Sequence, residues 1–178
     1  MKTRIETTLK MVVLLMFFAV AAQAETEVRE LQWDDLSPKE FDLYQEQSKI
    51  FDEYDIEKLT DGTPEAEEAM KRVKELNDNA PVVAELNDTM IKIPGFAVPF
   101  EYQDNVNRFL LVPYFGACIH TPPPPSNQII LIESEKPIPI EKLGDAIYIT
   151  GTLMVDHSSS DIAVSSYKLK MTDIEPYY

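Results

Sequence analysis

The chain contains a single cysteine, Cys118, and two histidines among its 178 residues. One cysteine cannot form an intramolecular disulfide, and without a second thiol to resolve a mixed disulfide a self-contained dithiol redox cycle is excluded. The sequence also lacks a glycine-rich phosphate loop, a G-x-S-x-G elbow and an H-E-x-x-H pair. No motif therefore supports a P-loop nucleotide hydrolase, an α/β-hydrolase or a zinc protease.

Basic residues are scarce. The chain has 16 lysines and arginines against 31 aspartates and glutamates, which gives a net charge of −15 at pH 7. Loss of residues 1–24 would remove three bases and one acid, and would change this net charge to −17. Such a surface repels nucleic-acid phosphates and anionic lipid headgroups, and it attracts cations and basic partners. The composition therefore excludes nucleic-acid binding.

The first 24 residues have the pattern of an export signal. Three basic residues precede an unbroken apolar run at residues 11–20, and Ala22-Gln23-Ala24 then provides a cleavage motif. The apolar run is shorter than the roughly 20 residues that span a bilayer, and no cysteine follows the small residues to carry a lipid. We expect Sec export, cleavage after Ala24, a periplasmic location and no stable membrane insertion.

Residues 25–80 are expected to form an acidic helical arm. Ser37-Pro38-Lys39-Glu40 has the pattern of a capping box with proline at the first helical position, so it predicts a helix start. Asp61-Gly62 ends this helix, and Thr63-Pro64-Glu65 predicts the start of a second one, which ends at residues 77–81. The expected packing edge of this second helix consists of Met70, Val73 and Leu76.

In residues 81–178 the sequence pattern changes to short apolar stretches separated by turn residues. This pattern predicts strands. The expected strands are residues 89–93, 96–100, 107–112, 128–133, 146–155 and 162–173. Pro94-Gly95 predicts a bend or bulge, Gly151 predicts strong bending, and residues 156–161 predict a polar hairpin connection. This order favours an α+β protein in which residues 81–178 form a small, mostly antiparallel, OB-like β-barrel, with a β-sandwich as the alternative.

The most distinctive stretch is Gly116-Ala117-Cys118-Ile119-His120-Thr121-Pro122-Pro123-Pro124-Pro125-Ser126-Asn127-Gln128, which we call the cysteine block. Cys118 and His120 are two positions apart, so on an extended backbone both side chains point to the same face. A thiolate and an imidazole on one face predict a soft-metal half-site or an activated thiol. The four prolines predict a stiff polyproline II segment that has no N–H donors.

Several motifs together resemble a poorly characterised bacterial family of exported proteins, a domain-of-unknown-function family. The cysteine block is the most specific of them, and Leu31-Gln32-Trp33-Asp34-Asp35-Leu36 is the weakest. The others are Ile93-Pro94-Gly95-Phe96-Ala97-Val98-Pro99, Phe109-Leu110-Leu111-Val112-Pro113-Tyr114, Gly151 and the strand with Tyr167. The resemblance implies an accessory protein that accompanies ABC-type transport, in some cases in zinc homeostasis, and it assigns no ligand to any residue.

Three interpretations of the cysteine block are open at the level of sequence. A metal site needs three or four ligands, and His157 is the candidate third ligand beside Cys118 and His120. This set suits Zn²⁺, or Cu(I) where copper is available. The second interpretation is thiol chemistry at Cys118, with Asn127 as the candidate orienting group.

The third interpretation is a binding module without chemistry. The proline segment would dock on aromatic residues of a partner, or brace Trp33, Tyr114 and Phe115 within the fold. Its residues are Pro122, Pro123, Pro124 and Pro125, followed by Asn127 and Gln128, whose amides can satisfy backbone groups. We therefore expect a non-enzymatic accessory protein in zinc handling beside an envelope transporter, with a structural adaptor and thiol chemistry as alternatives.

Overall fold

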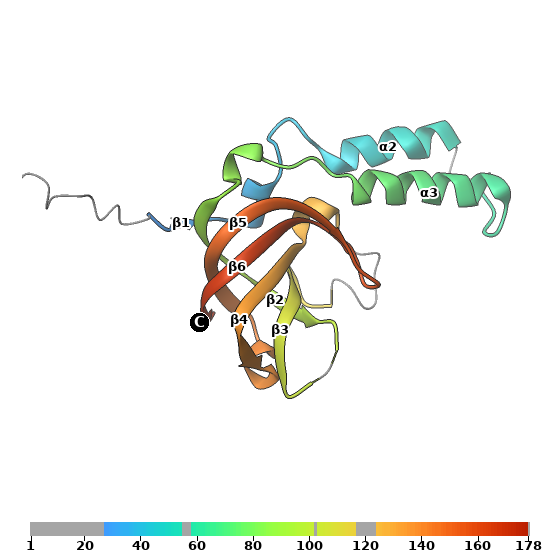
Figure 1. Cartoon of the computed structure of the whole chain (residues 1–178). Coiled ribbons are helices and arrows are strands. Elements are labelled where there is room, and N and C mark those ends of the chain that lie inside the picture. Colours follow the sequence, from blue (N-terminus) through green and yellow to red (C-terminus); the bar gives the residue numbers. More distant parts are fainter. Residues whose placement is uncertain (1–26, 55–57, 102, 117–123, 178) are drawn as a thin grey trace, which may run out of the picture.

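The protein consists of a two-helix arm at one end of a β-barrel (Figure 1). The structure is a computed structural model that describes residues 27–54, 58–101, 103–116 and 124–177. Its strands are β1 (Arg29–Glu30), β2 (Thr89–Pro99), β3 (Asn105–Val112), β4 (Ile130–Pro139), β5 (Ile147–Ser159) and β6 (Val164–Pro176). Its α-helices are α2 (Leu43–Tyr54) and α3 (Pro64–Asp78), and its 3₁₀ turns are η1 (Trp33–Leu36), η3 (Ala84–Leu86), η4 (Ser126–Gln128) and η5 (Ile140–Leu143). None of the helices in these ranges is long and apolar enough to cross a membrane.

Five strands close into a barrel. They pair in the order β2-β3-β4-β6-β5, and β5 pairs back with β2. Within the barrel only β4 and β6 are parallel, while the other pairings are antiparallel. The closed sheet confirms the predicted small, mostly antiparallel barrel, and the alternative of a sandwich is wrong.

Strand β2 closes the barrel by changing partner along its length. Its residues Thr89 to Gly95 pair with β5, and Phe96 to Pro99 pair with β3. The sequence predicted two strands here, but β2 continues through Pro94-Gly95. A Cβ added at Gly95 would lie 2.8 Å from the Leu111 Cγ and 2.9 Å from the Val112 carbonyl oxygen, so glycine is what allows β3 to approach.

Both faces are apolar at the end of β3 and at the start of β4. In β3, Phe109 and Leu111 point into the main core, whereas Leu110 and Val112 belong to a second cluster on the outer face. The same second cluster includes Leu131 of β4. Burial on two faces explains why residues 109–112 of β3 and 130–132 of β4 are continuous apolar runs in the sequence rather than alternating ones.

The arm differs from the sequence prediction at its start. Ser37 does not begin a helix, because it ends η1, and α2 begins six residues later. The Ser37 hydroxyl accepts hydrogen bonds from the side chains of Asn127 and Gln128 instead. The side chain of Asp42 accepts a bond from the Gln45 N–H at the actual start of α2. The local pattern predicted that the Ser37 hydroxyl caps a helix. In the structure this hydroxyl instead accepts hydrogen bonds from residues far away in the sequence.

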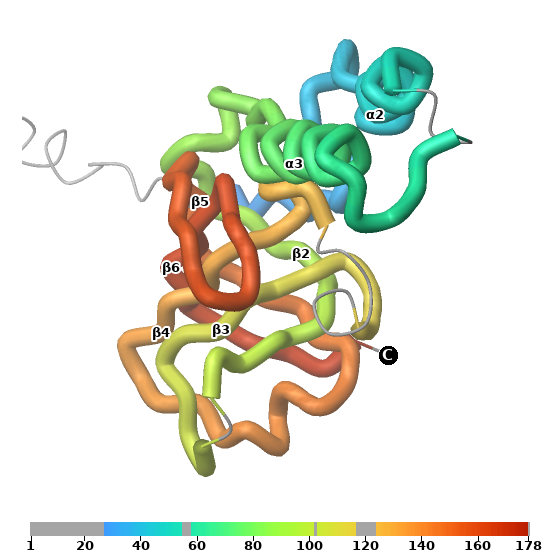
Figure 2. The backbone as a smooth tube through the Cα atoms, turned by 90° about the vertical axis from the view of Figure 1, so that its right-hand side faces the viewer, coloured from blue at the N-terminus to red at the C-terminus, as the bar shows by residue number. Residues whose placement is uncertain are grey.

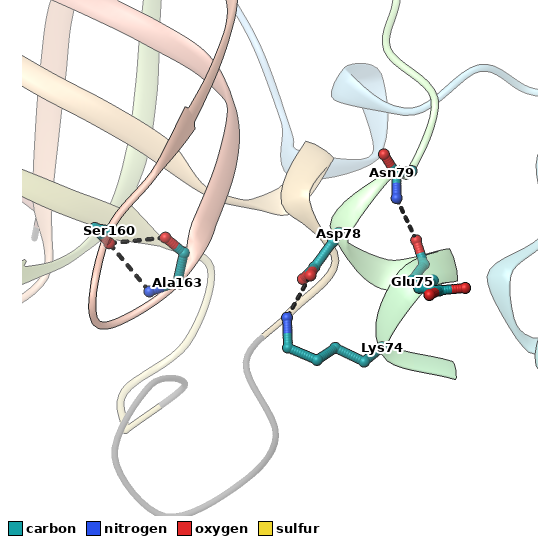
Figure 3. Close-up of polar contacts among 6 residues, drawn as sticks. All are labelled: Lys74, Glu75, Asp78, Asn79, Ser160 and Ala163. Atoms are coloured by element: carbon teal, nitrogen blue, oxygen red, sulfur yellow. Dashed lines mark hydrogen bonds and ion pairs between the residues drawn. The ribbon is translucent and has the colours of Figure 1, made fainter. Parts of the chain in front are cut away.

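Helix α3 has the predicted ends, and its predicted packing edge is confirmed in part, because Val73 and Leu76 are half-buried whereas Met70 is exposed. Thr63 caps its first turn by accepting a bond from the Ala66 N–H, and the Asn79 side chain donates to the Glu75 carbonyl at its end (Figure 3). The buried residues of the helix are Ala66 and Ala69, while Met70 is 61 % exposed. Helix α3 has α2 on one side and lies nearer the barrel than α2 does (Figures 1 and 2), so small residues suffice for this contact.

The β5–β6 hairpin is longer than the sequence predicted. Strand β5 continues to Ser159, and the turn is closed by Ser160, whose hydroxyl bonds to both the N–H and the carbonyl of Ala163 (Figure 3). Residues 156–159 are therefore strand rather than connection, because polar side chains at an exposed hairpin still allow backbone pairing. The pairing register shifts between Thr150 and Gly151, which confirms the predicted bend, and shifts again between Val155 and Ser158.

We expect Gly151→Ala to destabilise the protein by about 1–3 kcal/mol, because its Cβ would overpack a closed site. That atom would lie 2.2 Å from the Lys170 carbonyl oxygen and 2.6 Å from the Leu169 Cδ2. The matched control is Gly144→Ala, where the nearest atom is 3.9 Å away and φ is −73°. Urea unfolding measures both variants, and an equal response of the two would contradict the proposed close contact at Gly151.

Candidate functional site

The structure describes Gly116 at the start of the cysteine block and residues 124–128 at its end. Cys118, His120, Pro122 and Pro123 lie outside the described residues. Pro124 is buried, Pro125 is half-buried, and Asn127 has no exposed surface. The described end of the block is therefore packed inside the protein, with its last three residues in the turn η4.

Two side-chain amides join this end of the block to the arm. The Asn127 Nδ2 donates to the Ser37 hydroxyl (2.9 Å) and to the Pro81 carbonyl (2.8 Å). The Gln128 Nε2 donates to the Trp33 carbonyl (2.9 Å) and to the Ser37 hydroxyl (3.2 Å). These bonds satisfy backbone carbonyls at both ends of the arm, which is the role that sequence analysis considered for the two amides within the fold.

Tyr167 makes a second connection between the arm and the barrel. Its ring is fully buried, and its hydroxyl donates to the Leu36 carbonyl (2.8 Å) and accepts from the Val83 N–H (2.8 Å). Burial raises the pKa of this phenol above its ordinary value, since the charged form would lose its solvation. The sequence pattern did not predict this role. The available signal was a tyrosine at an inward position of a strand, where a buried hydroxyl needs partners.

Trp33 packs against the main core and reaches β2. Its indole N–H donates to the Pro94 carbonyl at 2.7 Å, next to the point where β2 changes partner. Trp33 therefore has a packing role within the fold. We call Trp33, Ser37, Asn127, Gln128 and Tyr167 the arm seam, because their hydrogen bonds hold the arm on the barrel.

His157 lies at the same end of the barrel as the arm seam. Its side chain is exposed on β5, within the segment where the pairing register shifts, and it lines a pocket of about 230 Å³ with Pro81 and Ser166. The Ser166 hydroxyl donates to the Ser126 hydroxyl at 2.7 Å. The structure therefore places His157 close to the described end of the cysteine block.

The described residues do not by themselves complete a metal site. No group of three or more His, Cys, Asp or Glu side chains comes together within these ranges, and two of the three candidate ligands are outside them. One buried acceptor near the pocket has no partner among the described residues, namely the Asn127 Oδ1. Buried polar atoms of this kind usually have a partner.

Two aromatic side chains are exposed just before the cysteine block. Phe115 is 81 % exposed and Tyr114 is 49 % exposed. The Phe115 ring makes an edge-on contact with Phe96, with 6.1 Å between the ring centroids. Phe96 in turn packs against the second cluster on the outer face of the barrel. These rings form an apolar surface next to the block.

Two comparisons with known proteins identify one family, and they do so over nearly the whole described chain. Residues 33–176 match the family described as "Protein of unknown function (DUF3299)". A crystal structure of a DUF3299 family protein from Pseudomonas aeruginosa PAO1 is similar, with 32% sequence identity and a TM-score of 0.62. The similarity covers 85% of this chain and 97% of that one. No curated protein matches.

We expect Tyr167→Phe to lower the free energy of unfolding by about 1–3 kcal/mol, because two buried backbone groups lose their partner. The raised pKa of Tyr167 adds a pH dependence. Above about pH 10 the unfolded chain loses this proton more readily than the folded one, so the stability of the parent falls with rising pH. The difference in free energy of unfolding between the parent and Tyr167→Phe should therefore become smaller above this pH.

Urea unfolding between pH 7 and pH 11 measures this effect. The control is Tyr148→Phe, since the Tyr148 ring contacts Tyr177 but its hydroxyl has no hydrogen bond to the described residues. If Tyr167→Phe loses no more unfolding free energy than Tyr148→Phe does, the Tyr167 hydroxyl does not hold the arm.

Proposed function

Because this chain belongs to the DUF3299 family, whose function is unknown, we propose its function from its own site. We propose an exported, non-enzymatic accessory protein that binds Zn²⁺ at the arm end of the barrel. The proposed ligands are Cys118, His120 and His157. The observation that carries this proposal is the position of His157 beside the described end of the cysteine block.

The path from His157 to the block has two steps. His157 and Ser166 line one pocket, and Ser166 is hydrogen-bonded to Ser126. His120 precedes Ser126 by six residues, which span at most about 20 Å when extended. The imidazole of His157 has no hydrogen bond to the described residues. These facts support a ligand set of one thiolate and two imidazoles, which zinc favours.

Export and charge support a role in metal handling. The leader pattern at residues 1–24 predicts a periplasmic protein, and the net charge of −15 attracts cations to its surface. We propose that the protein works beside an envelope transporter. The strand order, with β4 and β6 parallel in a five-stranded closed barrel, also supports the OB-like architecture, a fold used mainly for binding.

The test is calorimetric zinc titration of the reduced mature protein. The full chain is produced with its leader, recovered from the periplasmic fraction and sequenced from its N-terminus, where we expect Glu25. One zinc ion per chain should bind to the parent. Cys118→Ser and His120→Ala should each weaken binding at least tenfold, because each removes one ligand. His157→Ala should do the same.

Glu141→Ala is the matched control, because it removes an exposed acid from η5. It should leave zinc binding unchanged. Loss of binding in the first two variants but not in His157→Ala would remove His157 from the ligand set. Absence of binding in the parent would contradict the metal proposal as a whole.

A structural adaptor is the second candidate, favoured by the exposed rings of Tyr114 and Phe115. Because Pro124 and Asn127 are buried, the contact would be made by these aromatics rather than by that end of the block. A photo-crosslinking amino acid in place of Phe115 should then capture one discrete envelope protein in cells. The same probe in place of Tyr44, an aromatic of the arm that is 83 % exposed, is the control. Equal crosslinking from both positions would contradict the adaptor.

A further inference from the structure

A cleft opens in the barrel where β4 and β6 separate. The two strands pair in parallel from Ile130 and Tyr167 as far as Ser134 and Met171. Beyond these residues, the structure pairs β4 only with β3 and β6 only with β5. The cleft between them has a volume of about 900 Å³. It is lined by the end of β4 that lies far from the arm (Figure 1).

Prolines in β4 explain why the two strands part. The Ile140 N–H donates to the Asp104 carbonyl at the start of β3 (3.1 Å). Since successive residues of a strand direct their N–H groups to opposite edges, Pro137 and Pro139 have their nitrogens on the edge that faces β6. Proline has no N–H, so β4 cannot donate to β6 at these positions. The parallel pairing therefore stops before them.

The separation leaves β6 with a free edge. Asp173 and Ile174 pair with β5 on one side, Thr172 is the extra residue of β6 at the register shift, and none of the three has a strand partner on the side of the cleft among the described residues. The Thr172 hydroxyl donates to the Thr150 carbonyl on the paired side, so it does not cover the open edge. A free strand edge with unpaired backbone groups is a template for an added strand.

Three lysines without an ion pair among the described residues line the cleft. Several basic side chains elsewhere pair with carboxylates, for example Arg72 with Glu53 and Lys168 with Asp156. Lys136, Lys142 and Lys170 all line the cleft, and their ammonium groups have no ion pair within the described ranges.

Together with Arg108 the cleft has four cations, against the three carboxylates of Glu133, Glu135 and Asp173. Arg108 and Glu133 pair with each other at 3.6 Å. In a chain where acids outnumber bases 31 to 16, this local excess of positive charge is unusual. It favours a ligand that carries carboxylates.

The floor of the cleft is apolar. Ile138 is buried, and Met171 and Ile174 are half-buried against the main core. An extended peptide directs alternate side chains to opposite faces. One face of such a peptide would meet this floor, while the other would meet the lysines.

We propose that this cleft binds an extended peptide with alternating apolar and acidic residues, which adds to β6 as a strand at Thr172–Ile174. Backbone hydrogen bonds to the free edge supply affinity, and contacts of the carboxylates with Lys136, Lys142 and Lys170 select acidic side chains. The site is separate from the zinc site proposed above, so either can fail without the other.

Fluorescence polarisation with a labelled peptide Thr-Glu-Val-Glu-Val-Glu-Thr tests the proposal at physiological salt. It should bind to the mature protein, and the matched peptide with lysine for each glutamate should bind at least tenfold more weakly. The combined variant K136Q/K142Q/K170Q should lose at least tenfold in affinity. The control K39Q/K49Q/K71Q removes the same charge from the arm region and should stay within twofold of the parent.

Two further measurements separate strand addition from attraction of charge alone. The acidic peptide with N-methyl groups on alternate backbone nitrogens should lose at least tenfold in affinity, because it cannot pair with an edge. Amide NMR shifts of Thr172, Asp173 and Ile174 should move on titration. The proposal is overturned by an absence of binding at 1 mM peptide, by equal binding of the N-methylated peptide, by insensitivity to the three cleft lysines, or by shifts confined to the arm.

Discussion

The hydrogen bonds between buried side chains of the barrel and the backbone of the arm hold the two parts of this protein together. Asn127, Gln128 and Tyr167 satisfy backbone groups of segments that precede and follow the arm helices. Such groups would otherwise be buried without partners, which costs more than the bonds contribute when formed. The last residues of the cysteine block are therefore structural.

The two ends of the barrel differ in structure. At the arm end the strands are covered by the arm seam, and His157 lies on the rim beside the end of the cysteine block. At the far end the prolines of β4 interrupt the pairing with β6 and leave an open edge with lysines around it. The two proposals, a zinc ion at the first end and an extended peptide at the second, follow this difference.

Local patterns predicted those features that depend on neighbouring residues. The start of α3 at Thr63-Pro64 and its end near Asn79 follow from capping, and the bend at Gly151 follows from the absence of a side chain. Patterns failed where a distant partner competed. Ser37 accepts amide bonds from the cysteine block instead of capping a helix, and α3 buries Ala66 and Ala69 while Met70 is exposed.

For the candidate site, the sequence by itself determined the chemical types: one thiol, two imidazoles, a proline segment and a strongly acidic chain. It also determined the class of fold, since strand and helix periodicities are local. Only the tertiary structure decided that Asn127 and Tyr167 fasten the arm, that His157 lies by the end of the block, and that three unpaired lysines share one cleft. Each of these depends on which strands become neighbours when the barrel closes, and residues 30 to more than 100 positions apart carry no local pattern for it.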